Sequence, residues 1–134
     1  LVRSSAASDV YKRQVSESFA EKMVMCSTDF DSNVDEFEIS GLNPIASDKI
    51  NPPRLLESKV SFECELNQIV EIGNSDAGSG FIVIGTVLLF HVDDEVYENG
   101  RILLDKLEPI GRLAGNKYTR PSDVFEIARK IKPE

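Results

Sequence analysis

Three side chains in the second half of this sequence are of types that bind small molecules. His91 is the only histidine and ends an almost continuously apolar run, whereas Arg112 and Tyr118 lie in a glycine-punctuated segment. Histidine donates or accepts hydrogen bonds, arginine binds anionic oxygens, and tyrosine stacks on flat rings or donates through its hydroxyl. Each has a structural alternative: His91 could be packed and bonded to backbone, and Arg112 and Tyr118 could anchor their loop.

Catalytic and metal-binding motifs of the common kinds are missing. There is no nucleophile–base pair, phosphate-binding loop or dinucleotide glycine motif, so no catalytic residue is assigned. The carboxylates of residues 93–95 form an acidic turn that is more typical of a solvated surface than of a cation site. Cys26 and Cys64 have no metal-binding spacing, so we expect no metal and two reduced, packed thiols.

Two long stretches, residues 60–72 and 81–93, are expected to position these side chains as a β-hairpin. The first alternates between apolar and polar residues, which is typical of a half-buried strand. The second is nearly all apolar, which predicts a central strand covered on both faces. Gln68 falls on the apolar face and is expected to be a buried, hydrogen-bonded amide. Gly85 indicates a bulge or a close backbone approach.

The residues before the hairpin favour two short helices. An amphipathic pattern predicts a helix from about Ser16 to Cys26, with Ser16 as its cap. A shorter helix is expected at Val34–Ile39, capped by Asp31 or Ser32 and ended by Gly41.

The remaining segments favour short, mostly extended elements. Three prolines keep residues 42–57 mainly extended, with a short edge strand near Ile45. Residues 102–107 are expected to form a short strand and one helical turn. Residues 124–129 fit either a last strand or a short helix. Residues 74–80 supply the turn of the hairpin.

Length and charge limit the classes of protein to which the chain can belong. A chain of 134 residues is long enough for one domain with a core. Its net charge of −8 argues against a general nucleic-acid binder or a binder of anionic membranes. No apolar run approaches the roughly 20 residues of a membrane helix. We therefore expect a cytoplasmic protein without nucleic-acid or membrane partners.

Residues 1–14 differ from the remainder of the chain. They have no apolar period, and they resemble a sequencing-library adapter of the transposase type translated in frame. We therefore interpret 1–14 as a non-native leader and exclude it from the expected fold. Without it the net charge becomes about −10. Residues 15–134 are then the C-terminal portion of a single domain.

A set of short motifs occurs in a characteristic order along the chain. The motifs are Val34–Glu38 with Gly41–Leu42, Pro52–Arg54, Ser61–Cys64, Ile84–Val87, Phe90–Asp94, Asp105–Leu107 with Pro109, and Gly111–Leu113 with Asn116–Arg120. Together they resemble the C-terminal half of the flavin-reductase-like, FMN-binding split-barrel family, in its flavoredoxin-like branch. Ala114 departs from the pattern, because a second glycine is usual there.

The resemblance implies a mainly β (α+β) fold, an antiparallel Greek-key split β-barrel with one or two short helices, incomplete at its N-terminus. It also implies a homodimer that binds FMN at the subunit interface. NADH or NADPH would supply hydride to the flavin, and an acceptor would receive the electrons. His91, Arg112 and Tyr118 would contact the cofactor.

A second hypothesis is a non-catalytic acidic β-barrel module, or an inert fragment without its cofactor half. The missing catalytic motifs favour it, although flavin chemistry needs no protein nucleophile because the cofactor itself carries the hydride. Without the family's N-terminal strands, the apolar hairpin would expose an edge, and the chain alone is then expected to be unstable or to aggregate.

Overall fold

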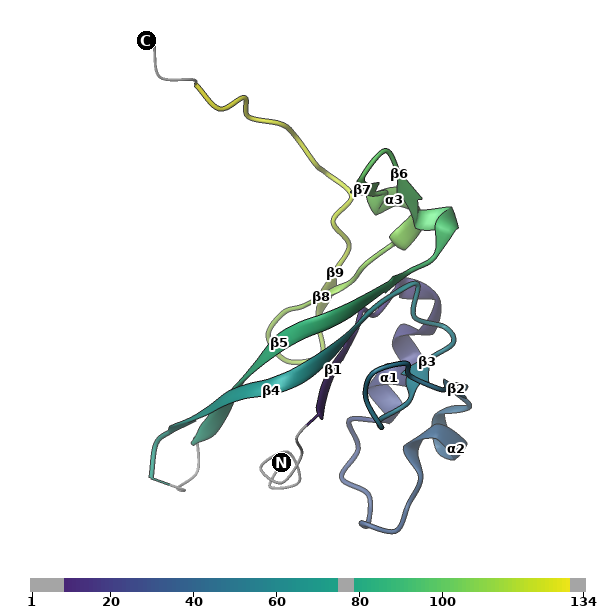
Figure 1. Cartoon of the computed structure of the whole chain (residues 1–134), viewed down its shortest axis with the longest axis vertical. Coiled ribbons are helices and arrows are strands. Elements are labelled where there is room, and N and C mark those ends of the chain that lie inside the picture. Colours follow the sequence, from purple (N-terminus) through teal and green to yellow (C-terminus); the bar gives the residue numbers. More distant parts are fainter. Residues whose placement is uncertain (1–8, 75–78, 131–134) are drawn as a thin grey trace.

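The computed structural model describes residues 9–74 and 79–130. Its main feature is a long antiparallel hairpin of β4 (Val60–Ile72) and β5 (Gly80–Val92), which confirms the predicted hairpin. A third strand, β1 (Asp9–Arg13), pairs antiparallel with β4, so the sheet order is β1-β4-β5. Figure 1 shows the helical segment of residues 20–40 on the side of β1 and β4.

Short elements precede and follow the hairpin. Before it lie a 3₁₀ turn (Glu17–Phe19), α1 (Ala20–Met25), α2 (Glu36–Ser40), and the paired strands β2 (Pro44–Ile45) and β3 (Arg54–Leu55). After it lie a 3₁₀ turn (Asp94–Val96), β6 (Tyr97–Glu98), β7 (Arg101–Ile102), α3 (Leu104–Leu107), β8 (Gly111–Arg112) and β9 (Tyr118–Thr119). The predicted helices, the strand near Ile45 and the strand and turn at 102–107 are confirmed.

The N-terminal ends of the two helices are not capped as predicted, whereas the predicted C-terminal end of the second is confirmed. Asp35, and neither Asp31 nor Ser32, caps α2, because its carboxylate accepts the backbone N–H of Phe37 at 2.9 Å. Gly41 ends that helix as predicted, with a left-handed φ of 62°. The buried Ser16 makes no capping bond.

Ser16 instead links the first helical segment to the far end of the chain. Its hydroxyl donates to the carbonyl of Leu107 at 2.6 Å, and it forms an isolated bridge with Pro109. The 3₁₀ turn at 17–19 is therefore tied to α3, more than 80 residues away along the chain.

The strand β1 lies within the residues that we had excluded from the expected fold. Asp9 pairs with Glu65 and Arg13 with Ser61, so the segment is in register with β4. The expectation that residues 1–14 take no part in the fold is therefore wrong for residues 9–13. That these residues derive from an adapter stays a prediction.

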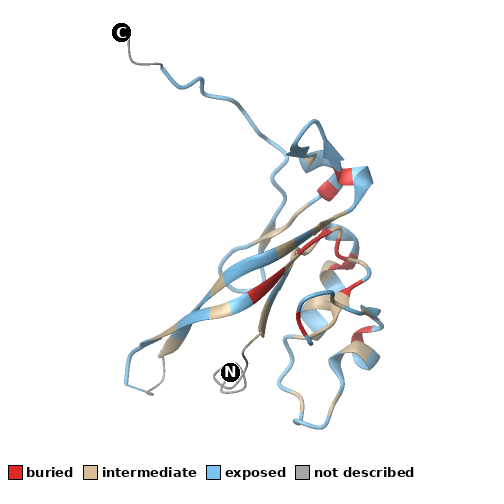
Figure 2. Ribbon diagram, viewed as in Figure 1, coloured by how far each residue is buried: buried red, intermediate tan, exposed pale blue. Residues whose placement is uncertain are grey.

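Strand β5 is an edge strand in the described sheet, and the prediction of a central strand covered on both faces is wrong. Figure 2 shows most of its length as exposed. The exposed large apolar side chains of β5 are Phe81, Ile82, Val83, Ile84, Val87, Leu88 and Phe90. An apolar run predicts that the strand is covered, and nothing within residues 9–74 and 79–130 covers it.

The alternation of β4 also breaks down at two residues. Glu63 was expected on the polar face, but it is fully buried because residues 47–54 cover that face. Gln68, expected as a buried amide, is exposed. Register shifts at Glu63/Cys64 and Leu66/Gln68 mark bulges, and the second, which adds Asn67 to β4, interrupts the period of two before Gln68.

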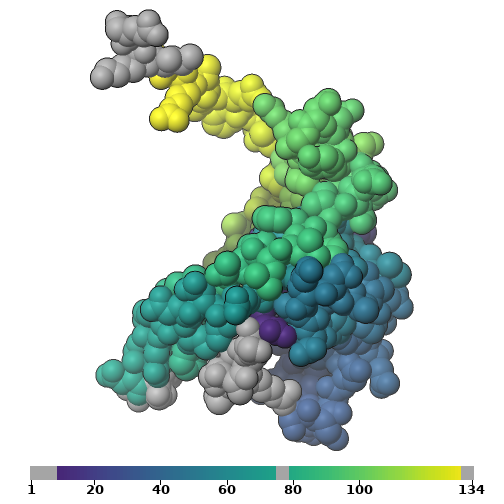
Figure 3. All heavy atoms as spheres, viewed as in Figure 1, coloured from purple at the N-terminus to yellow at the C-terminus, as the bar shows by residue number. Residues whose placement is uncertain are grey.

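Two small apolar clusters hold the elements together. Phe19, Leu42 and Leu55 form one, against which Val15, Cys26 and Phe37 pack. Val60, Val96 and Leu107 form the other, at the end of the hairpin where β5 leaves the sheet. Cys26 and Cys64 are free thiols, as predicted. Residues 121–130 form neither a strand nor a helix and extend away from the body (Figure 3).

Gly85 lies on β5 where this strand approaches β4 closely. A Cβ at this residue would lie 3.1 Å from the Cβ of Cys64, which is tighter than ordinary contacts. We expect Gly85→Ala to lower the free energy of unfolding by about 1 kcal/mol, the low end of overpacking costs. Gly80→Ala is the matched control on β5, because its Cβ would meet nothing within 4 Å. Urea unfolding of both variants measures the difference, and equal stabilities would contradict the close approach.

Candidate functional site

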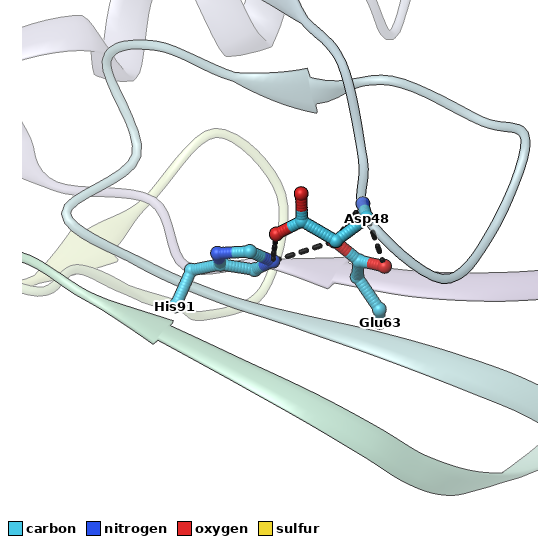
Figure 4. A group of neighbouring side chains, drawn as sticks. All are labelled: Asp48, Glu63 and His91. Atoms are coloured by element: carbon cyan, nitrogen blue, oxygen red, sulfur yellow. Dashed lines mark hydrogen bonds and ion pairs between the residues drawn. The ribbon is translucent and has the colours of Figure 1, made fainter.

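The candidate site is a group of three side chains, Asp48, Glu63 and His91, at the covered end of the hairpin (Figure 4). Glu63 lies on β4 opposite Leu89, and His91 lies on β5 opposite Ser61. Glu63 and His91 are therefore diagonal neighbours on one face of the pair. Asp48 comes from the connection between β2 and β3, which folds over that face.

Glu63 is the centre of the group and has no solvent-exposed surface. Its Oε1 lies 2.5 Å from Nε2 of His91 and accepts the backbone N–H of Asp48 at 2.9 Å. Its Oε2 accepts the backbone N–H of Lys49 at 2.6 Å. The Nε of Arg54 lies 3.7 Å from Oε1. The carboxylate of Glu63 thus connects β4 with His91 on β5 and with the loop that carries Asp48 and Lys49.

These contacts keep Glu63 ionised despite its burial. Burial by itself raises the pKa of the carboxyl group, but hydrogen bonds from the Asp48 and Lys49 amides and from His91 outweigh it. The net result is a pKa lowered to about 2. Glu63 is therefore a carboxylate at neutral pH, and it can only accept hydrogen bonds.

His91 is held by this carboxylate, so the alternative of a histidine bonded to backbone is wrong. Its side chain is 18% exposed, and Nε2 also lies 3.8 Å from Oδ2 of Asp48. Its second ring nitrogen, Nδ1, points away from both carboxylates (Figure 4). His91 is thus anchored at Nε2, and no hydrogen bond joins Nδ1 to the part of the chain that the structure describes.

The group has the composition of a metal site, but its surroundings favour an ion pair. One ligand atom from each of Asp48, Glu63 and His91 lies within 4.8 Å of the others. Both oxygens of Glu63 already accept backbone N–H groups, and the Arg54 cation lies beside them. A divalent cation would need those lone pairs. The absence of a metal stays a prediction. In the acidic turn at 93–95, the carboxylate of Glu95 forms an ion pair with Lys59 at 2.9 Å.

Arg112 and Tyr118 form a separate pair. They face each other across β8 and β9, with the guanidinium carbon of Arg112 5.8 Å from the centre of the Tyr118 ring. Arg112 also donates to the carbonyl of Gly115 at 3.2 Å. The contacts of His91 are with Asp48 and Glu63 instead. The structure therefore joins two of the three predicted residues and leaves His91 in its own group.

Tyr118 also lines a recess of about 300 Å³ beside α1, together with Ile110 and Arg120. Arg120 forms a salt bridge with Glu17 across this recess, with Nε donating to Oε2 at 2.6 Å. The half-buried ring of Tyr118 thus borders a hollow, and the exposed cation of Arg112 lies beside that ring, which suits an anionic or flat ligand.

Sequence reasoning missed Glu63 and Asp48. Glu63 looks like Glu65, because both fall on the polar side of an alternating strand. A diagonal pairing with His91 could have been a signal, but Glu63 differs from Glu65 only through the cover of residues 47–54, which the sequence does not reveal. Asp48 lies in a turn whose path over the sheet follows from tertiary packing.

Comparison with known proteins identifies the family. The model of the family described as flavin reductase like domain matches residues 11–110, and the chain belongs to this family. An uncharacterized protein of Aquifex aeolicus is 38% identical over 107 residues, which are 79% of this chain and 52% of that protein. The chain therefore spans about half the length of that curated relative.

Solved structures support the same assignment. Nitrilotriacetate monooxygenase component B from Bacillus cereus has a TM-score of 0.83 and 30% identity, covering 90% of this chain and 60% of that chain. A Shewanella frigidimarina structure with a split barrel domain has a TM-score of 0.78 over 92% of this chain and 62% of that chain. At 22% identity it shows the fold alone. The mainly β, split-barrel fold predicted from the sequence is thus confirmed. No helix within residues 9–74 and 79–130 is long and apolar enough to cross a membrane.

Proposed function

We propose that the protein to which this chain belongs is an FMN-binding oxidoreductase that takes hydride from NADH or NADPH and passes the electrons to an acceptor. The observation that carries the proposal is the family match over residues 11–110. When bound, the flavin supplies the redox chemistry, so the protein needs to supply binding, orientation and electrostatics. The charged and aromatic groups of the described residues are suited to those tasks.

The residues proposed to hold FMN are His91, Arg112 and Tyr118. Nδ1 of His91 is open to hydrogen-bond a polar edge of the ring system. Arg112 is an exposed cation that suits a phosphate or an anionic flavin, and the half-buried Tyr118 ring beside it can stack or donate. The donor types therefore fit the cofactor.

The proposed assembly is a cytoplasmic homodimer with FMN at the subunit interface. In support, β5 exposes a row of large apolar side chains, and apolar rows of that kind are covered in stable proteins. We assign no particular electron acceptor to the protein. One similar structure is a monooxygenase component B, and another, from Pseudomonas fluorescens, is a 2-nitrobenzoate 2-nitroreductase at 26% identity.

An FMN titration tests the proposal, with the product of the complete reading frame and this chain measured side by side. We expect saturable binding by the complete product, and bleaching of the flavin absorbance after NADH or NADPH is added without oxygen. Binding without bleaching would indicate a flavoprotein reduced by another partner. No binding would favour the alternative of a non-catalytic acidic β-barrel module.

His91→Ala is expected to weaken FMN binding about tenfold, the effect of losing one hydrogen bond of about 1.4 kcal/mol. Fluorescence quenching of FMN measures the dissociation constant. Tyr97→Phe is the control, because Tyr97 is exposed on β6 and belongs to neither group of site residues. An unchanged affinity in His91→Ala would remove His91 from the flavin site.

A further inference from the structure

We propose that Glu63 is a positioning residue that holds a proton on Nε2 of His91 and so makes Nδ1 the free hydrogen-bonding atom of the site. The geometry leaves one arrangement of hydrogens. Glu63 accepts backbone N–H groups at both oxygens, so it is a carboxylate without a proton to donate. The 2.5 Å contact with His91 therefore requires an N–H on Nε2.

The position of this proton determines what His91 can bind. With Nε2 protonated, the neutral imidazole is an acceptor at Nδ1, and the imidazolium becomes a donor there. The neutral form thus suits a ligand that offers an N–H donor, as a flavin imide or a nicotinamide carboxamide does. This part of the inference rests on the proposed function, whereas the position of the proton does not.

Among the described residues, two other charged groups lie beside the pair. Arg54 lies 3.7 Å from Oε1 of Glu63, and Oδ2 of the largely exposed Asp48 lies 3.8 Å from Nε2 of His91. Lys49 contributes only its backbone N–H to Glu63. Asp48 is too far for a direct hydrogen bond to His91. Glu63 alone therefore fixes the imidazole.

Glu63→Gln is expected to reverse the tautomer. The shortest backbone hydrogen bond to Glu63 runs from the N–H of Lys49 to Oε2 at 2.6 Å, so the amide oxygen of glutamine should occupy the position of Oε2. The amide NH₂ then faces His91 and donates to Nε2, which must lose its hydrogen. The proton moves to Nδ1, and the neutral ring presents a donor where it had presented an acceptor.

Nitrogen-15 NMR of the imidazole tests this directly, because the chain has one histidine and its signals need no assignment. At a pH where the ring is neutral, we expect the wild-type protein to show a protonated Nε2 and an unprotonated Nδ1. Glu63→Gln should show the reverse pattern. Glu63→Asp keeps the carboxylate and should restore the wild-type pattern, and Glu65→Gln, an exposed glutamate on the same strand, should not change it.

Two results would overturn the inference: a wild-type ring protonated at Nδ1, or a folded Glu63→Gln variant that keeps its proton on Nε2. The wild-type spectrum decides even where Glu63→Gln does not fold. FMN binding is measured separately, and Glu63→Gln should weaken it about tenfold, as His91→Ala does. A protein with protonated Nε2 that binds no FMN would support the proton assignment and refute the proposed function.

Discussion

Glu63→Gln is expected to lower the free energy of unfolding by about 3 kcal/mol at pH 7. The carboxylate is fully buried, and it accepts N–H groups from Asp48 and Lys49 as well as from His91. A glutamine offers one oxygen in place of two, so one buried donor faces an NH₂ group and loses its partner. Glutamine is also neutral, so the negative charge that balances the neighbouring Arg54 is lost. Urea unfolding at pH 7 measures the loss.

The same change should remove an acid-sensitive part of the stability. The pKa of Glu63 is lowered from 4.5 to about 2 in the folded protein. A lowered pKa stabilises the fold above the unfolded value, and this stabilisation is lost as the pH falls from 4.5 towards 2. At about 1.4 kcal/mol per pKa unit, the shift accounts for about 3 kcal/mol. The wild-type protein should therefore lose this much over that window.

The contrast between the two proteins is the decisive measurement. Glu63→Gln cannot titrate at residue 63, so its stability should approach that of the wild-type protein as the pH falls towards 2 and Glu63 takes up its proton. Glu65→Gln is the control, since Glu65 is exposed on the same strand and should change the stability by less than about 0.5 kcal/mol. A constant difference between wild-type and Glu63→Gln from pH 7 to pH 2 would contradict the pKa of Glu63.

The sequence predicts the elements of this fold better than it predicts their burial. Alternation and turn residues are local signals, and they were sufficient for the hairpin, the two helices and the strand at Ile45. Gln68 was placed on the wrong side, because a bulge between Leu66 and Gln68 interrupts the alternation and a bulge has no strong sequence signal. Glu63 lies on the expected face, but that face is covered. The cover over Glu63 comes from residues distant in the chain, which a local pattern cannot reveal.

The candidate site was predicted in part for the same reason. Residue type alone singled out His91 as a candidate, and Arg112 and Tyr118, chosen from one glycine-punctuated loop, lie together in the structure. The partner of His91 was missed because Glu63 and Glu65 are equivalent in sequence, while only the first lies beneath the loop of Asp48 and Lys49. The folding of that loop over the strand is a tertiary event.

Phe19→Ala is expected to cost about 3–5 kcal/mol, the usual range for a buried phenylalanine. Phe19 is 3% exposed and forms a cluster with Leu42 and Leu55, which flank the connection that carries Asp48 and Lys49. Removing the ring leaves a cavity between the helical segment and this connection. Thermal unfolding measures the loss. Val24→Ala is the control, since Val24 lies on α1 and is 41% exposed.

The same variant tests whether this core supports the site. If the Phe19 cluster holds the connection against the hairpin, its loss should also loosen the Asp48 and Lys49 amides from Glu63. Those two N–H groups should then exchange with solvent faster in Phe19→Ala than in Val24→Ala, under conditions where both variants are folded. Unchanged exchange would show that Ile50, which is buried in the same connection, and Glu63 are sufficient to hold it. Faster exchange would mean that the geometry of His91 depends on packing contacts made by the first helical segment.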